Sequence, residues 1–386
     1  MANISTNRNA FFQSDASQAS AARRALKAKH SSKHGSPVEL KSKILALCID
    51  ELASEGLEKP IVFTGESTGV ARRIDLNIGN KEFVFRGHTG PVASVALYTT
   101  SSRQRLLFTG SWDKSVRVWD IETCKCLSTV SAHSDFVKSL LVVPHLNLLF
   151  SGSADASIRV WKVQEDGKLV KAHTLKGHTR AVEDLTFDPS AATTTVKGVV
   201  VYSASSDASI REWRVGPEEA VELPNAISKV HETSIYKLRF DHEGVLWSAS
   251  ADGTARRTDL ATKVSDTALE HPDFVKDILV TSNGAWAVTG CRDEEVRIFD
   301  IGSGAIVKVI EGHYDEVSAL AMWGNILLSA SLDGTIRQWS MVEADVRAMK
   351  KVVWEEEEEE EVKPATGLTA EEEAELADLM GSDDDL

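Results

Sequence analysis

The fold is indicated by two short apolar runs joined by a polar turn, residues 106–121, which read LLFTGSWDKSVRVWDI. Both runs are rich in β-branched and aromatic residues, and Gly, Ser and Asp separate them, as in two strands joined by a tight turn. Residues 61–76, IVFTGESTGVARRIDL, have the same pattern earlier in the chain. Repetition every ~40–45 residues is typical of β-propeller blades, so the pattern predicts further copies along the chain.

Four positions recur in the same order in six successive units. Each unit begins with a histidine: His88, His133, His178, His231, His271 and His313. A hydroxyl residue ends the next apolar run: Thr109, Ser151, Ser203, Ser248, Thr289 and Ser329. An aspartate stands four residues after each hydroxyl: Asp113, Asp155, Asp207, Asp252, Asp293 and Asp333. Six residues after the aspartates come Trp119, Trp161, Trp213, Thr258, Phe299 and Trp339.

These motifs resemble those of the WD-repeat β-propeller family. Gly87-His88 matches the GH dipeptide of that family, and Trp119-Asp120 matches its WD pair. The resemblance implies an all-β fold, a seven-bladed β-propeller of four-stranded antiparallel blades. The seventh unit includes residues 61–76, which have no Asp or Trp at the recurring positions and are not preceded by the recurring His. From Ile44 to Trp339 the seven units average about 42 residues, within the usual blade period.

The charge distribution divides the chain into three parts. Residues 1–36 form a basic, Ser- and Ala-rich arm that we expect to be disordered, because it has no apolar periodicity. Residues 37–354 form the predicted propeller. Residues 355–386 form an acidic tail in which fifteen acids accompany one base, and a capping box at Thr369 predicts a short helix. The strand that closes blade seven could come from residues 37–40 or from residues 345–353.

The repeated His, Ser or Thr, and Asp could suggest a hydrolase, but the pattern favours a structural network. A catalytic triad is made once per site, whereas this set occurs six times in the same order. The resemblance implies a Trp–His–Ser/Thr–Asp hydrogen-bond tetrad in each blade, and a buried imidazole needs a partner on both nitrogens. The chain also has no phosphate-binding loop and no clustered metal ligands. We therefore expect no enzymatic activity, no catalytic residue, no cofactor and no metal.

The resemblance also places a partner surface on the narrow top face around the central channel. Its positions lie three and five residues after each histidine and one residue before each aspartate. The most distinctive of these residues are large and apolar or charged: Trp112, Phe136, Lys138, Glu183, Tyr236, Phe274, Lys276, Arg292 and Leu332. Aromatic side chains beside cations are enriched at binding hot spots.

The sequence therefore predicts a scaffold or adaptor that binds other proteins, or a multiprotein complex, on the top face. Two alternatives remain open. One is a substrate receptor of a cullin-type ubiquitin ligase, although Glu122 stands where such receptors often carry an Arg after the WD pair. The other is an assembly factor or chaperone that binds a basic client, such as a ribosomal protein or a histone, through the acidic tail.

The composition limits partners and location. Without the tail the chain is almost neutral, which argues against direct specific DNA binding. No apolar run is long enough to span a membrane, and the N-terminus lacks the apolar core of a secretory signal. The four cysteines form no dense framework, which favours a reducing compartment. We therefore expect a cytoplasmic or nuclear protein with no membrane partner.

Overall fold

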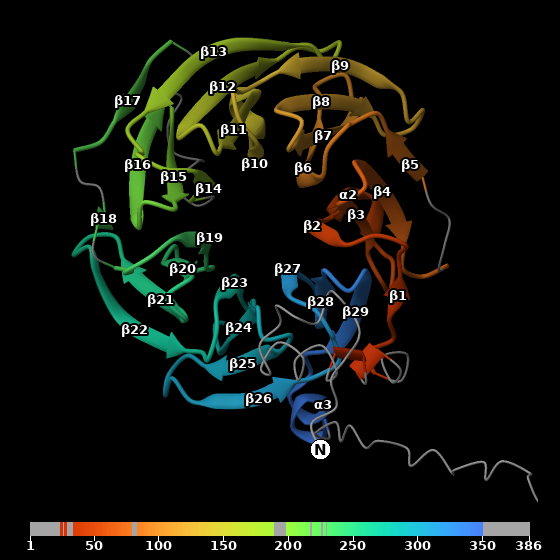
Figure 1. Cartoon of the computed structure of the whole chain (residues 1–386), viewed down its shortest axis with the longest axis vertical. Helices are drawn as coiled ribbons and strands as arrows, with labels where there is room; N and C mark the ends of the chain where they lie inside the picture. The colour runs from red at the N-terminus through yellow and green to blue at the C-terminus, as the bar shows by residue number, and fades with distance from the viewer. Residues whose placement is uncertain are drawn as a thin grey trace, which may run out of the picture. The chain divides into compact units, whose positions relative to one another are not determined.

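The described part of the chain is a ring of seven small antiparallel sheets around a central channel (Figure 1). The computed structural model describes residues 24–25, 27–28, 34–78, 83–188, 198–216, 218–224, 227–228 and 230–349. The predicted seven-bladed propeller is confirmed. The predicted acidic tail with its short helix lies outside the described residues, as does most of the predicted N-terminal arm.

Each blade runs from an inner strand at the channel to an outer strand at the rim, and in blades one to six the strands follow in chain order. Blade one consists of β2 (Ile44–Ile49), β3 (Ile61–Glu66), β4 (Val70–Asp75) and β5 (Phe83–Arg86). Blade two consists of β6 (Val92–Thr99), β7 (Arg105–Ser111), β8 (Ser115–Asp120) and β9 (Cys126–Ser131). Blade three consists of β10 (Val137–Val143), β11 (Leu148–Ser153), β12 (Ser157–Val163) and β13 (Leu169–Lys176), with the 3-10 helix η3 (Pro144–Leu146) between its first two strands.

The remaining blades continue in the same order. Blade four consists of β14 (Val182–Phe187), β15 (Val199–Ser205), β16 (Ser209–Val215) and two outer pieces, β17 (Ala220–Glu222) and β18 (Ile227–Ser228). Blade five consists of β19 (Ile235–Phe240), β20 (Leu246–Ser250), β21 (Thr254–Asp259) and β22 (Val264–Glu270). Blade six consists of β23 (Val275–Val280), β24 (Trp286–Cys291), β25 (Val296–Asp300) and β26 (Ile306–Ile310).

Blade seven is completed by the N-terminal side of the chain, which closes the ring. Its strands are β27 (Val317–Trp323), β28 (Ile326–Ser331), β29 (Thr335–Ser340) and the outer strand β1 (Val38–Glu39). Val38 pairs with Ile336, and the Leu40 amide donates to the Gly334 carbonyl at 2.7 Å. The other candidate segment, residues 345–353, instead starts within the helix α3 (Glu343–Ala348). Closure joins the two ends of the ring by backbone hydrogen bonds.

The first strand of every blade carries the same irregularity. The register shifts by one residue next to its start, as between Val92 and Ser94 in β6. Equivalent shifts occur in β2, β10, β14, β19, β23 and β27. The broken alternation of the sequence after Val92 predicts such a bulge. The bulge turns the following side chains toward the channel, where Ser94 lines the central cavity.

The core lies between blades rather than within one of them. One buried cluster joins Phe108 of blade two to Leu149 and Trp161 of blade three, and the next joins Phe150 to Val201 of blade four. Each blade therefore buries its two apolar faces only against its neighbours. The loop after β2 contains the short helix α2 (Glu51–Ser54), where Asp50 accepts the Ala53 amide at 3.1 Å. None of the described helices has the length and apolar character that crossing a bilayer requires.

Candidate protein-interaction face

Four blades hold a complete polar network beneath the top face. In blade three, Nδ1 of His133 lies 3.0 Å from an Asp155 oxygen, and its Nε2 lies 2.8 Å from Ser151 Oγ. The Trp161 indole donates to the same hydroxyl at 3.0 Å. The chain of donors thus runs from indole to hydroxyl to imidazole to carboxylate. Blades two, four and seven have the same network: Trp119–Thr109–His88–Asp113, Trp213–Ser203–His178–Asp207 and Trp339–Ser329–His313–Asp333.

Burial and hydrogen bonding fix the protonation of these networks. Burial lowers the pKa of the His133 imidazole, although the Asp155 carboxylate opposes the shift, so the ring is neutral. Burial raises the pKa of the Asp207 carboxyl, but hydrogen bonds from His178 and Ser209 outweigh it and lower the pKa well below its ordinary value. The Ser151 hydroxyl is fully buried, so a substrate cannot reach it. The geometry serves to hold strands together rather than to activate a nucleophile.

Blade five has part of the network. His231 lies 2.9 Å from an Asp252 oxygen and 2.7 Å from Ser248 Oγ. Thr258 occupies the tryptophan position, and its buried hydroxyl has no hydrogen-bond partner among the described residues. The nearby Trp247 indole donates to Asp241 instead, at 3.1 Å.

Blade six departs from the predicted tetrad, and the assignment of Asp293 to it is wrong. Nδ1 of His271 donates to the Leu269 carbonyl at 3.0 Å, while its Nε2 lies 2.7 Å from Thr289 Oγ1. Asp293 is instead bound by both terminal nitrogens of Arg297, at 3.1 and 2.6 Å. A guanidinium four residues away provides two charge-assisted hydrogen bonds, which are stronger than one bond from a neutral imidazole. Burial, followed by the nearby Arg297 charge, lowers the pKa of His271 to about 4.

Blade one has polar contacts of its own in place of the network. The fully buried Glu66 carboxylate accepts hydrogen bonds from the Ser42 hydroxyl and from Arg72. Thr64, which stands in the hydroxyl position, is buried and its oxygen has no partner among the described residues. Glu66 stands two residues after Thr64, where the other blades have a serine or a cysteine, so blade one has an ion pair between its second and third strands in addition to the backbone ladder.

On the top face, the structure brings two of the predicted aromatic residues together as a stacked pair. Trp112 lies in the turn between β7 and β8, and Phe136 lies just before β10 in the next blade. Their ring centroids are 5.1 Å apart and their planes differ by 16°. Trp112 is 42% exposed and Phe136 is 39% exposed, and neither ring belongs to a core cluster. A stacked pair that faces solvent leaves apolar surface available to a partner.

A second aromatic pair carries its own cations. Tyr236 of β19 and Phe274, which precedes β23, have ring centroids 6.4 Å apart. The Lys276 ammonium lies 3.9 Å from the centre of the Tyr236 ring, and the Arg292 guanidinium lies 4.9 Å from that of Phe274. Both are cation–π contacts. Phe136 and Phe274 belong to blades three and six, whose inner strands β10 and β23 lie on opposite sides of the channel in Figure 1.

The charged residues of the predicted surface pair with one another. Lys138 binds both oxygens of Glu183, at 2.6 and 2.8 Å, and Lys276 lies 3.0 Å from Glu316. Leu332 lies in the turn between β28 and β29, where its amide donates to the Glu316 carbonyl at 2.9 Å. The two lysines are therefore neutralised within the ring itself.

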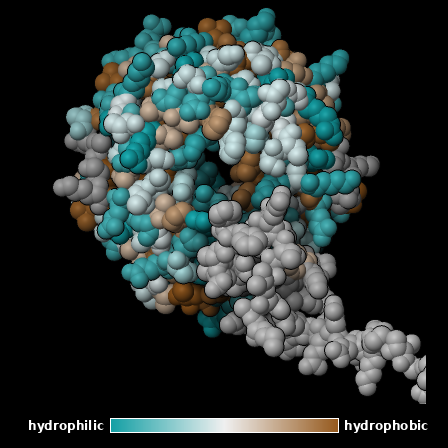
Figure 2. All heavy atoms as spheres, viewed as in Figure 1, coloured by the Kyte–Doolittle hydropathy of each residue, from teal (hydrophilic) through white to brown (hydrophobic). Residues whose placement is uncertain are grey.

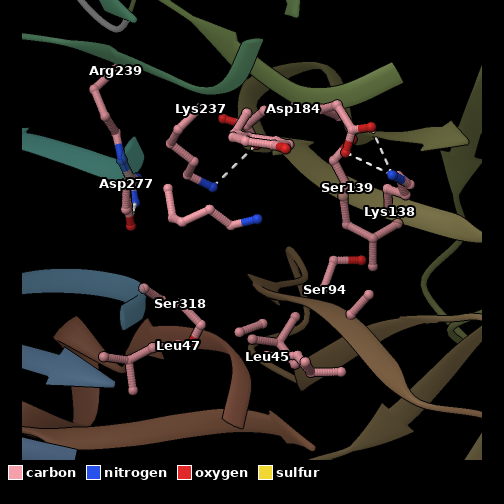
Figure 3. Close-up of a pocket in the computed structure, with 18 residues that line it drawn as sticks. Leu45, Leu47, Ser94, Lys138, Ser139, Asp184, Lys237, Arg239, Asp277 and Ser318 are labelled. Carbon is pink, nitrogen blue, oxygen red and sulfur yellow. Dashed lines mark hydrogen bonds and ion pairs between the residues drawn. The ribbon is translucent and has the colours of Figure 1, made fainter. Parts of the chain in front are cut away.

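The central channel opens beneath these residues. The space-filling view shows the opening at the centre of the ring (Figure 2), and the residues that line it enclose a cavity of about 210 Å³. Asp184 accepts from the Leu238 amide of the next blade at 3.0 Å, and Asp277 accepts from the Leu320 amide of its next blade at 2.8 Å. Figure 3 shows Lys237 beside Asp184, to which it donates at 3.1 Å. These carboxylates join neighbouring blades at the wall of the channel.

One contact at the top face has no counterpart in the sequence analysis. Arg24 and Lys27 belong to the basic arm for which the sequence predicts disorder. In the structure both are helical, and both bind Glu294, at 2.8 and 2.7 Å. Their spacing of three residues is the sequence signal that one helical face could carry both charges. Within the described ranges, no three His, Cys, Asp or Glu side chains gather into a metal-binding group.

A further recurring position also escaped the sequence analysis. An arginine stands two residues before the tryptophan position in every blade, blade one included: Arg72, Arg117, Arg159, Arg211, Arg256, Arg297 and Arg337. In three blades it forms an ion pair with a nearby carboxylate, Glu66, Glu222 or Asp293. This position would have identified blade one without its missing His, Asp and Trp.

Comparison with known proteins gives a consistent result. Residues 79–120, 124–162, 169–214, 264–300 and 304–340 match the family described as WD domain, G-beta repeat. The matches omit the inner strands of blades one and five, where the tryptophan position holds Ile74 and Thr258. The crystal structure of the WD40 β-propeller domain of Doa1 shares the fold, with a TM-score of 0.65 and 20% identity over 81% of this chain and 97% of that one.

Several curated proteins are similar in sequence. An uncharacterised WD repeat-containing protein of Schizosaccharomyces pombe is 33% identical over 90% of this chain and 92% of its own length. The nuclear distribution protein PAC1 of Coccidioides posadasii is 27% identical, and the match covers 66% of this chain and 58% of that protein. The human kinesin-like protein KIF21B is 27% identical over 66% of this chain, which spans 14% of its length.

Proposed function

The chain belongs to the WD-repeat β-propeller family. We propose that it is a non-enzymatic scaffold that binds partner proteins on its top face. Propellers of this family generally bind other proteins or complexes, which supports the coarse assignment. The fold alone does not specify a role, because one fold serves many functions. The surface residues must therefore carry the finer proposal.

The observation that carries the proposal is the exposed stack of Trp112 on Phe136. Two aromatic rings from neighbouring blades that stack in solvent, outside every core cluster, add little to the packing of the ring. A partner that covers them would bury apolar area on a preformed platform. A buried aromatic anchor contributes about 2 kcal/mol to binding, which is about thirtyfold in affinity.

The charged residues have a smaller part in this proposal. Lys138 and Lys276 already pair with Glu183 and Glu316, so their charges are largely satisfied before a partner arrives. Arg292 is exposed and lies against Phe274, where it extends the aromatic surface with a positive edge. We expect the aromatic residues to set the affinity, and Arg292 to contribute most of the salt dependence.

We also infer a cytoplasmic or nuclear location. All four cysteines are free: Cys48, Cys124, Cys126 and Cys291. Free thiols on a described surface, such as that of Cys126, are typical of a reducing compartment. Location of the tagged full-length chain by microscopy tests this inference, and accumulation in a secretory compartment would contradict it.

The test is a comparison of partner binding by three forms of the full-length chain. Proteins captured by the wild type are identified by quantitative mass spectrometry, and the principal one is titrated against each form. Trp112→Ala/Phe136→Ala should weaken binding by about thirtyfold or more. The matched control is Phe83→Ala, since Phe83 is 42% exposed but lies on the outer strand β5. Melting curves check that all forms are folded, and equal affinity for all three would overturn the top-face assignment.

A further inference from the structure

We propose that Glu294 and Asp315 form an acidic site for basic peptides on blades six and seven. Residues 24–28 of the same chain occupy this site as a displaceable ligand. The chemical class of ligand is a basic helical segment with two cations three residues apart. A partner that carries such a segment would compete with residues 24–28. This last step rests on the proposed function, whereas the site and its occupant within the chain do not.

The contacts between the segment and the ring are specific. The Lys27 ammonium lies 2.7 Å from one oxygen of Glu294, and Arg24 Nε lies 2.8 Å from the other. Arg24 also lies 3.6 Å from Asp315 of blade seven. Lys27 is only 1% exposed, and Glu294 is buried as well. A lysine and a glutamate are both buried in this way only when they are paired, because desolvation of either charge alone is costly.

Glu294 is unusual for its position. Each blade has a left-handed residue in the turn between its second and third strands, with φ between 62° and 81°. The equivalent residues in the other blades are neutral or basic: Gly69, Lys114, Ala156, Ala208, Gly253 and Gly334. A glutamate at φ 77° bears a conformational cost that glycine avoids. Its carboxylate is thereby presented at the top of blade six, where Arg24 and Lys27 bind it.

The geometry also defines what the site accepts. Arg24 and Lys27 are helical and three residues apart, so both charges lie on one side of a helical turn. The two oxygens of Glu294 are divided between them, and Asp315 extends the negative charge beneath Arg24. The hydrogen bond to Glu294 raises the pKa of Arg24, with Asp315 adding to the shift. An acidic or phosphorylated peptide would be repelled by the same carboxylates.

The site adjoins the predicted partner surface. Asp315 precedes Glu316, which pairs with Lys276, and Glu294 follows Arg292 by two residues in one turn. A partner that covers Phe274 and Arg292 would therefore meet residues 24–28 at the edge of its footprint. A basic segment at that edge of the partner could form the same two ion pairs with Glu294. Displacement would then replace the ion pairs of Arg24 and Lys27 by equivalent ion pairs to the partner.

The first experiment measures access to Lys27 by acylation of the full-length chain with a water-soluble amine-reactive ester, followed by peptide mass spectrometry. In the wild type, Lys27 should react at least about tenfold more slowly than Lys168, which is 68% exposed and lies in blade three, away from the site. Glu294→Gln should bring the two rates within about threefold of each other. The control Glu232→Gln removes an exposed acid after His231 of blade five and should leave Lys27 protected. Equal rates for Lys27 and Lys168 in the wild type would overturn the proposal.

The second experiment supplies the segment as a separate molecule. A labelled peptide with the sequence of residues 20–31 is titrated into full-length wild type and into full-length Arg24→Ala/Lys27→Ala. The variant should bind the peptide at least about tenfold more tightly, because the intramolecular segment competes in the wild type at an effective concentration in the millimolar range. Addition of Glu294→Gln to the variant should abolish binding, and addition of Glu232→Gln should not. Equal binding to both forms, or binding that survives Glu294→Gln, would contradict the site.

These outcomes are separable from those of the proposed function, because neither experiment uses the aromatic surface or an identified partner. If Lys27 is protected and the peptide binds, while Trp112→Ala/Phe136→Ala leaves partner binding intact, only the aromatic surface is wrong. The proposed competition is tested last, by acylation in the presence of the captured partner. Saturation with the partner should raise the Lys27 rate at least about threefold, and an unchanged or lower rate would exclude displacement.

Discussion

Blades three and six hold the same turn in different ways. In blade three a neutral imidazole links Ser151 to Asp155, and an indole completes the network. In blade six Phe299 stands in the tryptophan position. His271 donates a hydrogen bond to a backbone carbonyl, and Arg297 binds Asp293 instead. Both arrangements tie the aspartate turn to the body of the blade. The repeat therefore preserves an anchored turn rather than one set of bonds.

The difference has a consequence for the surface. In blade three the residue after the aspartate is Ala156, which makes no charged contact. In blade six that residue is Glu294, and it binds the N-terminal segment. With Asp293 held by Arg297, two adjacent acids in one turn have separate cationic partners. Blade six, in which the histidine does not bind the aspartate, is thus also the blade that provides Glu294 to Arg24 and Lys27.

The largest expected effect comes from the arginine position that both blades share. Arg297→Met would leave Asp293 and Glu295, which it binds at 2.6 and 2.5 Å, without that guanidinium. Loss of one partner from a buried ion pair destabilises by about 3–5 kcal/mol. Arg159→Met in blade three should cost under about 1 kcal/mol, because no described side chain forms an ion pair with Arg159 and its Nε is already unpaired.

The measurement is the free energy of unfolding from urea titrations of both variants and the wild type. The two substitutions are chemically identical and occupy equivalent positions in β25 and β12. Equal losses of stability would show that the ion pair of Asp293 is no more important than an unpaired arginine, and would remove the proposed difference between the blades.

The next effect is a dependence of stability on pH. The folded pKa of His271 is lowered to about 4 by burial, from an ordinary value of 6.5. Between these values the unfolded chain binds a proton that the folded chain does not, so stability falls as pH falls through this window and is fully present above it. His271→Gln should lose about 2 kcal/mol less than the wild type between pH 7 and pH 5.

His133→Gln provides the comparison from blade three. Burial also lowers the pKa of His133, but Asp155 opposes that shift, so its removal should change the pH dependence less. Unfolding free energies at the two pH values give both slopes, and the remaining histidines are common to all forms. A larger effect of His133→Gln than of His271→Gln would reverse the expected order.

The smallest expected effect on stability comes from placing a phenylalanine in blade three at the position where blade six has Phe299. Trp161→Phe removes the indole donor to Ser151, a hydrogen bond of 3.0 Å, and should destabilise the chain by about 1 kcal/mol. Trp286→Phe is the control, since the Trp286 indole forms no hydrogen bond with a described residue and packs only partly buried. Denaturant midpoints that shift equally for the two variants would argue that the lost hydrogen bond contributes nothing.

The aspartate of blade six illustrates where sequence-based prediction of a site fails. Asp293 has the same spacing from Thr289 as Asp155 has from Ser151, so the pattern assigns both to one network. The spacing indicates where the backbone turns. The hydrogen bond to the aspartate depends on which nearby donors compete for its carboxylate. Arg297, four residues away, is a stronger donor than a neutral imidazole. The top-face residues were likewise placed by position, whereas their pairing as Trp112 on Phe136 required the structure.

The number of repeats and the positions of the buried network could be predicted from the sequence, because both depend on the pattern within one repeat of about 42 residues. That Val38–Glu39 closes blade seven, and that Arg24 and Lys27 bind Glu294, became visible in the folded chain alone. These contacts join residues some 270–300 positions apart. Periodicity describes the local chain and contains no record of such pairs, which form only when the ring brings its first and last blades together.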